Sequence, residues 1–486
     1  MEPISRRTAL ALGGIGLVSA TVGGVGLWRE LAATGPAGTA GGTFRAPEEL
    51  RSADGVLDVR LEVSRGLHDV AGRQATTLGY NGGVPGPTLR VRAGDTLRIE
   101  LVNRLQEATN LHVHGLHVSP EGTADNVFLS VGPGTSQQYE YVLPADHPAG
   151  TFWYHPHLHG TVADQLFGGL YGAIVVDDPT QDLPVTRERT LVVSDLTLDG
   201  SGHVVAASAP ERMMGREGDL VLVNGQLRPR LDATSGEREL WRVVNACASR
   251  FLDLSLAGQD VRVVGRDGAR LGRDSGLDGI VLTPGNRADL VVEPTEGRSE
   301  LTAHPVDRGG PMGHMMGSDL LPGDGGPVAI ADLVVGPGPT ADLAPVPAAP
   351  APRDLRDTEV SGRRTLTFRM GMGGMMAGGG GFTIDGRTFD PDRVDQQVRL
   401  GTVEEWTIRN DSPMDHPFHL HVWPMQVLAV GGSPVSEPLW LDVVNVPAGG
   451  AVTVRVPFED FGGRTVYHCH VLDHEDLGMM GTVTAR

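Results

Sequence analysis

One short pattern occurs three times along the chain and restricts the fold to a tandem of related units. In each copy a glycine precedes an asparagine by nine residues, across a short apolar-rich run: Gly94 and Asn103, Gly236 and Asn245, Gly401 and Asn410. Runs of this length and composition are typical of β-strands. Because self-similarity within a chain indicates repeated structural units, the sequence predicts three related β domains.

The rest of the chain agrees with this interpretation. Short alternating runs bounded by Gly and Pro, such as 57–63 and 97–101, replace the long helical periodicity of an α protein. Such runs are typical of β-sandwiches and barrels, so we expect an all-β fold. The length of 486 residues suits about three domains. We place a signal and flexible tether at 1–43 and three domains at 44–180, 181–336 and 354–486. A Pro/Ala-rich linker at 337–353 joins the second domain to the third.

Eight of the 17 histidines form four H-x-H pairs, and the pairs follow the repeat. Two pairs begin nine residues after Asn103 and Asn410, and two begin five residues after Gly150 and Gly463. In order, the pairs are His112 and His114, His155 and His157, His419 and His421, and His468 and His470. The middle domain has Leu254 at the corresponding position and no such pair.

Alternate residues of a strand project from one face, so each pair presents two imidazoles together. A lone histidine is more often a satisfied surface or core residue, but that explanation does not account for four matched pairs. Imidazole clusters suit Cu, Zn, Fe or Ni. We therefore expect a polynuclear metal centre between the first and third domains, which neither domain can assemble alone.

The third domain adds a second set of metal-binding side chains. Cys469 lies between His468 and His470 and therefore points to the opposite strand face. Two histidines, a thiolate and a weak axial methionine make a blue-copper electron-transfer site, here from His416, Cys469, His474 and Met479. The first domain lacks all four, with Thr109, Pro156, Thr161 and Leu166 instead. The other cysteine, Cys247, has no such neighbours and is expected to be a small core residue.

Together these motifs resemble the four copper motifs of the multicopper oxidases, over roughly residues 50–486. The resemblance implies three cupredoxin-like Greek-key β-barrel domains and four copper ions, which are one type 1, one type 2 and two type 3. It assigns the type 1 ion to His416, Cys469, His474 and Met479, and the type 2 ion to His112 and His419. It assigns one type 3 ion to His114, His155 and His470, and the other to His157, His421 and His468. Val113 departs from the family, where many members have Trp, but removes no ligand.

The family reduces O2 to water, which consumes protons, so carboxylates near the centre should relay them. Glu475, next to His474, and Asp125, downstream of the first pair, resemble the two acidic relays of the family. Because the loop around Asp125 looks longer than usual, Glu121 is a rival for that role. The alternative for each carboxylate is an ordinary solvated surface charge.

Methionines are concentrated in short stretches, one of them Met213 and Met214. Two glycine-rich stretches and one site near His416 supply the candidates for Cu(I) binding: Met312, Met315, Met316, Met370, Met372, Met375, Met376 and Met414. Thioethers are soft ligands that select Cu(I). The stretches resemble the cuprous-oxidase branch of the family, as does the motif at 155–160, in which His159 need not be a ligand. The alternative is that these loops are merely flexible surface.

Three hypotheses for function follow. The first is an oxidase that couples Cu(I) oxidation, in copper detoxification, to O2 reduction and also accepts small phenols. The second is a laccase that oxidises phenols or aromatic amines without a role for Cu(I). The third is a non-enzymatic cupredoxin-fold protein of the cell envelope, although such proteins lose copper ligands and this chain keeps all of those expected. Copper nitrite reductases use related domains but have no need of eight histidines in this arrangement.

Charge and the first residues limit partners and location. The formal charge of −20 argues against nucleic acid, and the absence of lysine excludes lysine-based catalysis. Arg6 and Arg7 precede an uncharged, glycine-rich run at 9–27, which resembles a signal for the twin-arginine (Tat) export machinery. We expect a periplasmic, envelope-associated or secreted protein that contacts a membrane only if this segment is retained. A short membrane anchor is the alternative interpretation.

Replacing Arg6 and Arg7 together by Lys is expected to leave the folded protein inside the cell, because a receptor reads the arginine pair rather than hydrophobicity. The measurement is the distribution of the protein between cell fractions. Undiminished export of the double variant would point instead to the general secretory route or to an anchor.

Overall fold

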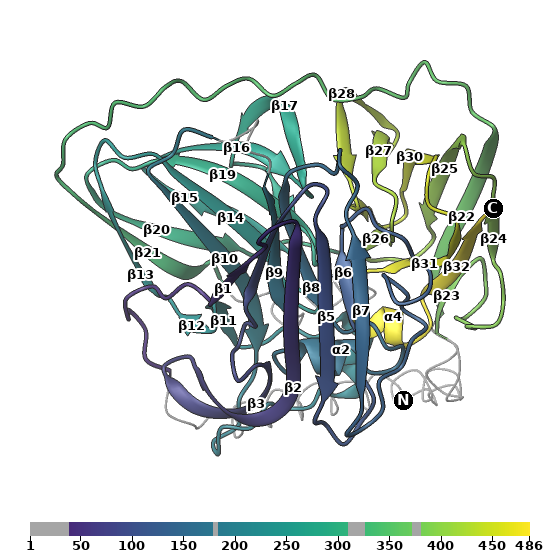
Figure 1. Cartoon of the computed structure of the whole chain (residues 1–486), viewed down its shortest axis with the longest axis horizontal. Coiled ribbons are helices and arrows are strands. Elements are labelled where there is room, and N and C mark those ends of the chain that lie inside the picture. Colours follow the sequence, from purple (N-terminus) through teal and green to yellow (C-terminus); the bar gives the residue numbers. More distant parts are fainter. Residues whose placement is uncertain (1–37, 178–182, 310–325, 372–380) are drawn as a thin grey trace, which may run out of the picture.

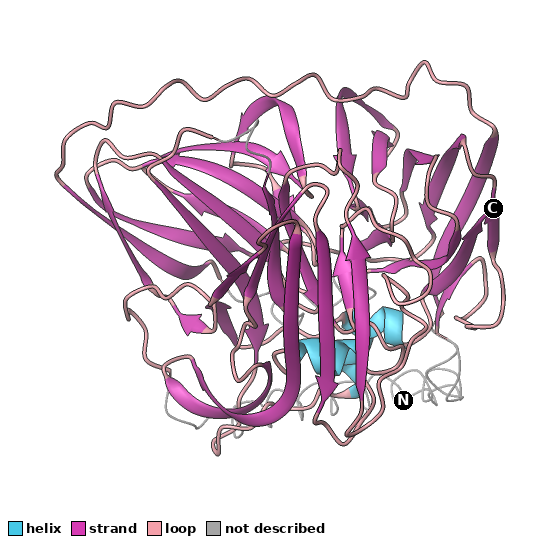
Figure 2. Cartoon of the chain, viewed as in Figure 1, coloured by secondary structure: helices cyan, strands magenta, loops and turns pink. Residues whose placement is uncertain are grey.

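The computed structural model describes residues 38–177, 183–309, 326–371 and 381–486, and strands dominate it (Figure 2). The expected all-β fold is confirmed. The described helices are short: α2 (Val162–Phe167), α3 (Ala209–Met214) and α4 (Leu472–Asp476). None of these helices combines the length and the apolar character that crossing a bilayer requires.

The first part of the chain folds into a five-stranded sheet, β1-β4-β9-β8-β6, and a four-stranded sheet, β3-β2-β5-β7. Its hydrophobic core lies between them and includes Leu61, Ile99 and Ile174. The strands are β1 (Glu49–Arg51), β2 (Val56–Val70), β3 (Arg73–Tyr80), β4 (Thr88–Arg92), β5 (Thr96–Asn103), β6 (His112–His114), β7 (Ser136–Val142), β8 (Gly150–His155) and β9 (Gly172–Asp177).

The middle part forms a seven-stranded sheet, β12-β11-β10-β14-β19-β16-β17, and a five-stranded sheet, β13-β21-β20-β15-β18, around a separate core. The strands are β10 (Arg187–Leu196), β11 (Leu220–Val223), β12 (Gln226–Leu227), β13 (Arg230–Thr234), β14 (Glu239–Asn245), β15 (Leu252–Leu256), β16 (Asp260–Arg266), β17 (Ala269–Gly276), β18 (Val281–Leu282), β19 (Arg287–Glu293), β20 (Gly297–His304) and β21 (Val328–Gly336).

The last part forms a six-stranded sheet, β23-β22-β25-β30-β27-β28, and a five-stranded sheet, β24-β32-β31-β26-β29, around a third core. The strands are β22 (Gly362–Met370), β23 (Phe382–Ile384), β24 (Gln396–Val398), β25 (Thr402–Asn410), β26 (His416–Leu420), β27 (Met425–Val430), β28 (Ser433–Leu441), β29 (Val443–Val446), β30 (Ala451–Phe458), β31 (Gly463–Cys469) and β32 (Met480–Ala485).

The three units lie side by side, with the first in front of the junction between the other two (Figure 1). Residues 337–353 form neither helix nor strand and cross the top of that view from the middle unit to the last. Trp153, Leu166 and Val244 belong to an apolar cluster that joins the first and middle units, and Leu472 of α4 belongs to it as well. The exact domain boundaries remain predictions.

The threefold pattern in the sequence corresponds to one structural feature. Gly94, Gly236 and Gly401 have φ values of 84°, 85° and 73°, a conformation that glycine adopts without strain. Each precedes a central strand, β5, β14 or β25, and the asparagine is the last residue of that strand. In every unit this strand pairs parallel with one neighbour and antiparallel with the other.

The three asparagines are buried and make equivalent hydrogen bonds. Asn245 Nδ2 donates to the carbonyls of Arg250 and Leu282, both at 2.9 Å, and its Oδ1 accepts from the Cys247 N–H at 3.1 Å. Asn103 and Asn410 bond the corresponding main-chain groups. Each amide thus ties the end of the central strand to the loop that follows, which in the first and last units leads to an H-x-H pair.

The end of the predicted tether differs from the expectation. The N–H groups of Thr39 and Gly41 donate to the carbonyls of Ala71 and Arg228, at 2.8 and 2.9 Å. Phe44 packs against the core of the middle unit rather than that of the first. Residues 38–43 therefore follow the surface of the folded body, because their main-chain groups find partners there. Residues 1–37, with the expected export signal, lie outside the described residues.

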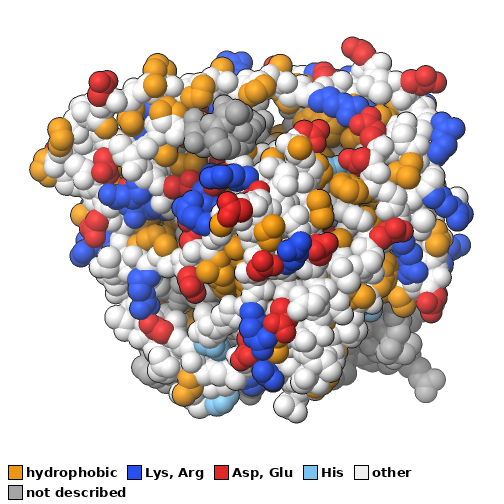
Figure 3. Space-filling view, viewed as in Figure 1, with side chains coloured by type: hydrophobic (Ala, Val, Ile, Leu, Met, Phe, Trp, Pro, Cys, Tyr) orange, Lys and Arg blue, Asp and Glu red, His pale blue; other side chains and the backbone are white. Residues whose placement is uncertain are grey.

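Charged side chains of both signs are interspersed over the face shown in Figure 3. Ion pairs also lie beneath the surface, since the buried Arg90 pairs with Glu49 at 3.0 Å, with Asp177 at 2.7 Å and with Glu188. Arginine and carboxylate therefore neutralise each other locally.

Replacing Asn245 by Ala is expected to destabilise the middle domain by about 3 kcal/mol, because two buried carbonyls and one buried N–H lose their partner. The melting temperature of that domain should fall by about 6–12 °C in calorimetry. Asn126→Ala is the control, since its half-buried amide makes similar bonds nearer the surface, to the Gly122 carbonyl and from the Phe128 N–H. Equal shifts for the two variants would contradict the role of the buried amide.

Candidate metal centre

Two pairs of antiparallel strands carry the H-x-H pairs to the contact between the first and third domains. β6 pairs with β8 so that His112 lies opposite His155, and β26 pairs with β31 so that His419 lies opposite His468. All eight imidazoles are buried, with no more than 2% of any residue exposed. In β6 the alternation of the strand turns both His112 and His114 toward one place, and in the other three pairs the second histidine lies one or two residues past the end of its strand.

The structure brings all eight predicted histidines together. The three nitrogen trios that lie within 4.8 Å of one another are His114, His155 and His470; His157, His421 and His468; and His112, His114 and His419. Every trio combines the first and third domains. The shortest contacts are those of His468 Nε2 with His157 Nε2 at 3.0 Å and with His421 Nε2 at 3.1 Å. His470 Nε2 lies 3.3 Å from His114 Nδ1.

In His112, His155 and His419 the outer ring nitrogen has a hydrogen-bond partner, whereas the inner nitrogen has none in the described structure. The Nδ1 atoms of His155 and His419 donate to the carbonyls of Pro156 and Asp442, both at 2.8 Å. The Nε2 atoms of the same rings are buried and have no hydrogen-bond partner in the described part of the chain. Hydrogen bonds of this kind fix the tautomer and aim the second nitrogen at a metal.

The donor set fits copper. Burial lowers the pKa of His155 to about 3 and that of His468 to about 4, so the imidazoles are neutral, as ligands must be. Nitrogens bound about 2.0 Å from one ion lie about 3.3 Å apart in a tetrahedral arrangement, close to the separations here. Buried polar atoms rarely lack a partner, and these nitrogens gain one if an ion is bound. Imidazole clusters of this type suit copper.

The second predicted set lies within the third domain. Cys469 Sγ lies 3.4 Å from His416 Nδ1 and 3.8 Å from His474 Nδ1, and the two nitrogens are 3.2 Å apart. Burial raises the pKa of the Cys469 thiol, so the thiolate form needs a bound cation. Met479 belongs to the same buried cluster as Cys469, and its carbonyl accepts from the Cys469 N–H at 3.0 Å. These residues have the composition of a blue-copper site.

The two candidate proton relays lie against the histidine cluster. Asp125 is 1% exposed, and its Oδ1 accepts from His112 Nδ1 at 2.8 Å. Glu475 is fully buried, with Oε2 3.1 Å from His468 Nδ1 and Oε1 3.6 Å from His157 Nδ1. Burial raises the pKa of Asp125 to about 8 and also raises that of Glu475. The rival Glu121 is exposed, so the structure favours Asp125.

Helix α4, which carries His474 and Glu475, is held by the other two domains. Asp473 pairs with Arg216 of the middle domain, at 2.5 Å for the shortest contact. Asp476 accepts from the N–H groups of Gly160 and Ala163 in the first domain, at 2.7 and 2.9 Å. Sequence reasoning missed both aspartates, although their position on either side of His474 and Glu475 was a usable signal.

Methionines near the second set come from different parts of the chain. The Met213 carbonyl, at the end of α3 in the middle domain, accepts from His474 Nε2 at 3.0 Å. Met370 pairs with Phe382, whose ring stacks on His474 at 4.3 Å. Met414 is 1% exposed. The other candidates lie outside the described residues: Met312, Met315, Met316, Met372, Met375 and Met376.

Comparisons with known proteins agree in all three domains. Three family models described as multicopper oxidase match residues 62–181, 187–300 and 358–486. Multicopper oxidase mco of Staphylococcus aureus is 29% identical over 424 residues, which cover 85% of this chain and 84% of that protein. Cell division protein FtsP of Edwardsiella tarda is also 29% identical, over 435 residues, covering 86% of this chain and 87% of that protein.

Solved structures show the same likeness. A multicopper oxidase from Campylobacter jejuni, described as a metallo-oxidase, has a TM-score of 0.80 and 29% identity, covering 92% of this chain and 96% of that one. A laccase-like multicopper oxidase from Ochrobactrum has a TM-score of 0.79 and 26% identity, covering 91% of this chain and 100% of that one. The cupredoxin-like fold is therefore confirmed. The chain belongs to the multicopper oxidase family and is a copper-dependent oxidoreductase.

Proposed function

We propose that this oxidase takes single electrons from Cu(I), in copper detoxification, and passes them to O2 after export by the Tat route. Multicopper oxidases use O2 and a reducing substrate, and the choice of Cu(I) is the specific part of the proposal. Four Cu(I), one O2 and four protons give four Cu(II) and two waters, so electrons and atoms balance. Small phenols are a second class of reductant in this proposal.

Four resident copper ions would be held as the family motifs imply. The type 1 ion would have His416, Cys469, His474 and Met479, and the type 2 ion His112 and His419. The type 3 ions would have the trios His114, His155, His470 and His157, His421, His468, which the structure brings together. Bound in these places, copper supplies one-electron redox chemistry on the side of the reductant and multi-electron chemistry on the side of O2.

The side chains have separate tasks in this scheme. The main chain of Cys469 joins its sulfur to His468 on one side and His470 on the other, so one residue of covalent structure connects the two donor sets. The Glu475 carboxyl holds a proton beside His468 and His157, since burial favours its neutral form. The Asp125 carboxyl does the same beside His112 and His421, whose Nδ1 lies 3.7 Å from Asp125 Oδ2.

The observation that supports Cu(I) as the substrate is the position of the described residues in and next to the methionine stretches. His474 Nε2 donates to the carbonyl of Met213, and Met213 packs against the core of the third domain. Met370 is the cross-strand partner of Phe382, whose ring stacks on His474. Gly309, the last described residue before Met312, forms a bridge with Met414. The described residues Met213, Gly309 and Met370, at or next to the three stretches, therefore lie close to the His416 and His474 region, where soft thioethers would serve a Cu(I) substrate.

A laccase without a Cu(I) role is the second candidate, favoured by the similarity to the Ochrobactrum enzyme, which is described as having oxidase activity towards lignin model compounds. A non-enzymatic envelope protein is the remote alternative, suggested by the similarity to FtsP. The complete and convergent donor sets argue against it, because a structural role does not require them.

Replacing Cys469 by Ser is expected to abolish the blue thiolate-to-copper absorption and turnover, while the histidine cluster keeps its copper. Visible spectra and copper analysis per chain check this. Cys247→Ser is the matched control, since that buried sulfur is 3.9 Å from the Val193 carbonyl and has no metal-binding neighbour in the described structure. Blue colour in the Cys469 variant would refute the type 1 assignment.

Changing Met312, Met315, Met316, Met370, Met372, Met375 and Met376 together to Ser is expected to raise KM for Cu(I) or lower its turnover, because soft ligands are lost. Phenol oxidation in the same preparation is the internal control and should survive or rise. Steady-state kinetics with both reductants measure the effect. Unchanged Cu(I) kinetics would contradict a role of these methionines in Cu(I) binding and favour a laccase without a Cu(I) role.

A further inference from the structure

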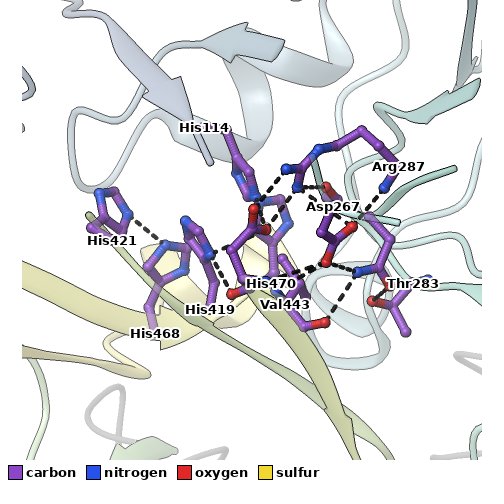
Figure 4. Close-up of polar contacts among 12 residues, drawn as sticks. His114, Asp267, Thr283, Arg287, His419, His421, Val443, His468 and His470 are labelled. Carbon is purple, nitrogen blue, oxygen red and sulfur yellow. Dashed lines mark hydrogen bonds and ion pairs between the residues drawn. The ribbon is translucent and has the colours of Figure 1, made fainter. Parts of the chain in front are cut away.

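Arg287, the first residue of β19, is a buried arginine at the point where the three domains meet (Figure 4). Its side chain is fully buried, and its two terminal nitrogens donate to both carboxylate oxygens of Asp442, at 2.7 and 2.6 Å. Its Nε donates to the Thr151 carbonyl of the first domain at 3.0 Å. One guanidinium of the middle domain thus holds groups of the first and the third.

Asp442 in turn touches two predicted copper ligands from different domains. Its Oδ1 accepts from His114 Nε2 at 3.1 Å, and its carbonyl accepts from His419 Nδ1 at 2.8 Å. Both bonds leave the opposite ring nitrogen facing the cluster: His114 Nδ1 approaches His470, and His419 Nε2 is unpartnered. Asp442 therefore determines which nitrogen each of these rings presents.

The middle domain also fixes the main chain on either side of this contact. Asp267 Oδ2 accepts from the Asp442 N–H at 3.3 Å, and Asn286 Nδ2 donates to the Val443 carbonyl at 3.0 Å. Gly115 has no room for a side chain, because a Cβ there would lie 2.5 Å from Asp442 Oδ2. Asp442 can therefore shift little without displacing its neighbours.

We propose that Arg287 is a positioning residue of the polynuclear copper centre, acting through Asp442 on the imidazoles of His114 and His419. The proposal rests on the copper assignment above but not on the choice of reductant. A buried ion pair is often no better for stability than an apolar pair of similar volume. The two parallel hydrogen bonds from the Arg287 guanidinium, however, hold the Asp442 carboxylate in one orientation. A lysine ammonium cannot make this pair of bonds.

The test compares Arg287→Lys and Asp442→Asn with Arg242→Lys. Arg242 is a buried arginine on the neighbouring strand β14, paired with Glu188 at 2.9 Å and Asp289 at 3.4 Å and bonded to the Thr151 hydroxyl at 3.4 Å, with no histidine among its partners in the described structure. The measurements are copper per chain, the type 2 electron paramagnetic resonance signal, resistance of copper to a chelator, and melting of the copper-free proteins. The blue absorption of the type 1 site reports in each case that the third domain is folded.

The first two variants are expected to keep the blue absorption, lose or alter the type 2 signal, and bind cluster copper about 10–100-fold more weakly. Arg242→Lys should retain the wild-type signal even where melting falls. Wild-type signals and chelator resistance in both variants would overturn the proposal and leave Arg287 a structural clamp. If Arg287→Lys does not fold, Asp442→Asn decides, since it keeps the shape of the side chain and removes its charge.

A second arm separates positioning from stability. The double variant Arg287→Met with Asp442→Leu replaces the ion pair by an apolar pair, which restores burial without the acceptor for His114. A folded double variant with the wild-type type 2 signal would contradict the proposal. A wild-type enzyme that itself lacks a type 2 signal would instead contradict the copper assignment, so the two failures are distinguishable.

Discussion

Eight neutral imidazoles buried in one domain contact are the constraint on which the rest of this structure depends. Each ring needs a partner for both nitrogens, and a dry interface supplies few. The fold meets part of this demand from outside: main-chain carbonyls, Asp125 and Asp442 bond the outer nitrogens of His112, His114, His155 and His419, whose inner nitrogens face the cluster. Because the rings come from two domains, ligand geometry is only as accurate as the docking of those domains.

The middle domain, which supplies no predicted ligand of the four resident copper ions, controls much of that docking. Arg287 and Asp267 hold the loop at Asp442, and Arg216 holds Asp473 beside His474. The backbone at Gly285 lies so close to His470 that a Cβ there would lie 2.9 Å from the ring nitrogen. The third domain therefore meets the first both directly and through a shared neighbour, and the middle domain supports both donor sets.

Features that depend on local backbone geometry could be predicted from the sequence. Alternation along a strand predicts that His468 and His470 face one way and Cys469 the other, and the structure places them so. The repeated asparagines are visible in sequence because each bonds main chain a few residues away. Arg287 and Asp442 are 155 residues apart, and no local pattern connects them. Only burial in the folded structure distinguishes Asp125 from Glu121 as the candidate proton relay. The position of residues 38–43 depends on the folded surface that they contact, which cannot be seen in the sequence.

The long separation of the ligands also has a consequence for biosynthesis. His157 and His468 are 311 residues apart, and His114 and His470 are 356 apart. At a synthesis rate of about 5–20 residues per second, the half-site of the first domain waits about 15–70 s for its other half. During that interval it offers bare imidazole pairs to any divalent ion, zinc included. Selection of the correct metal must therefore fall after translation, at the moment when the last domain closes on the first.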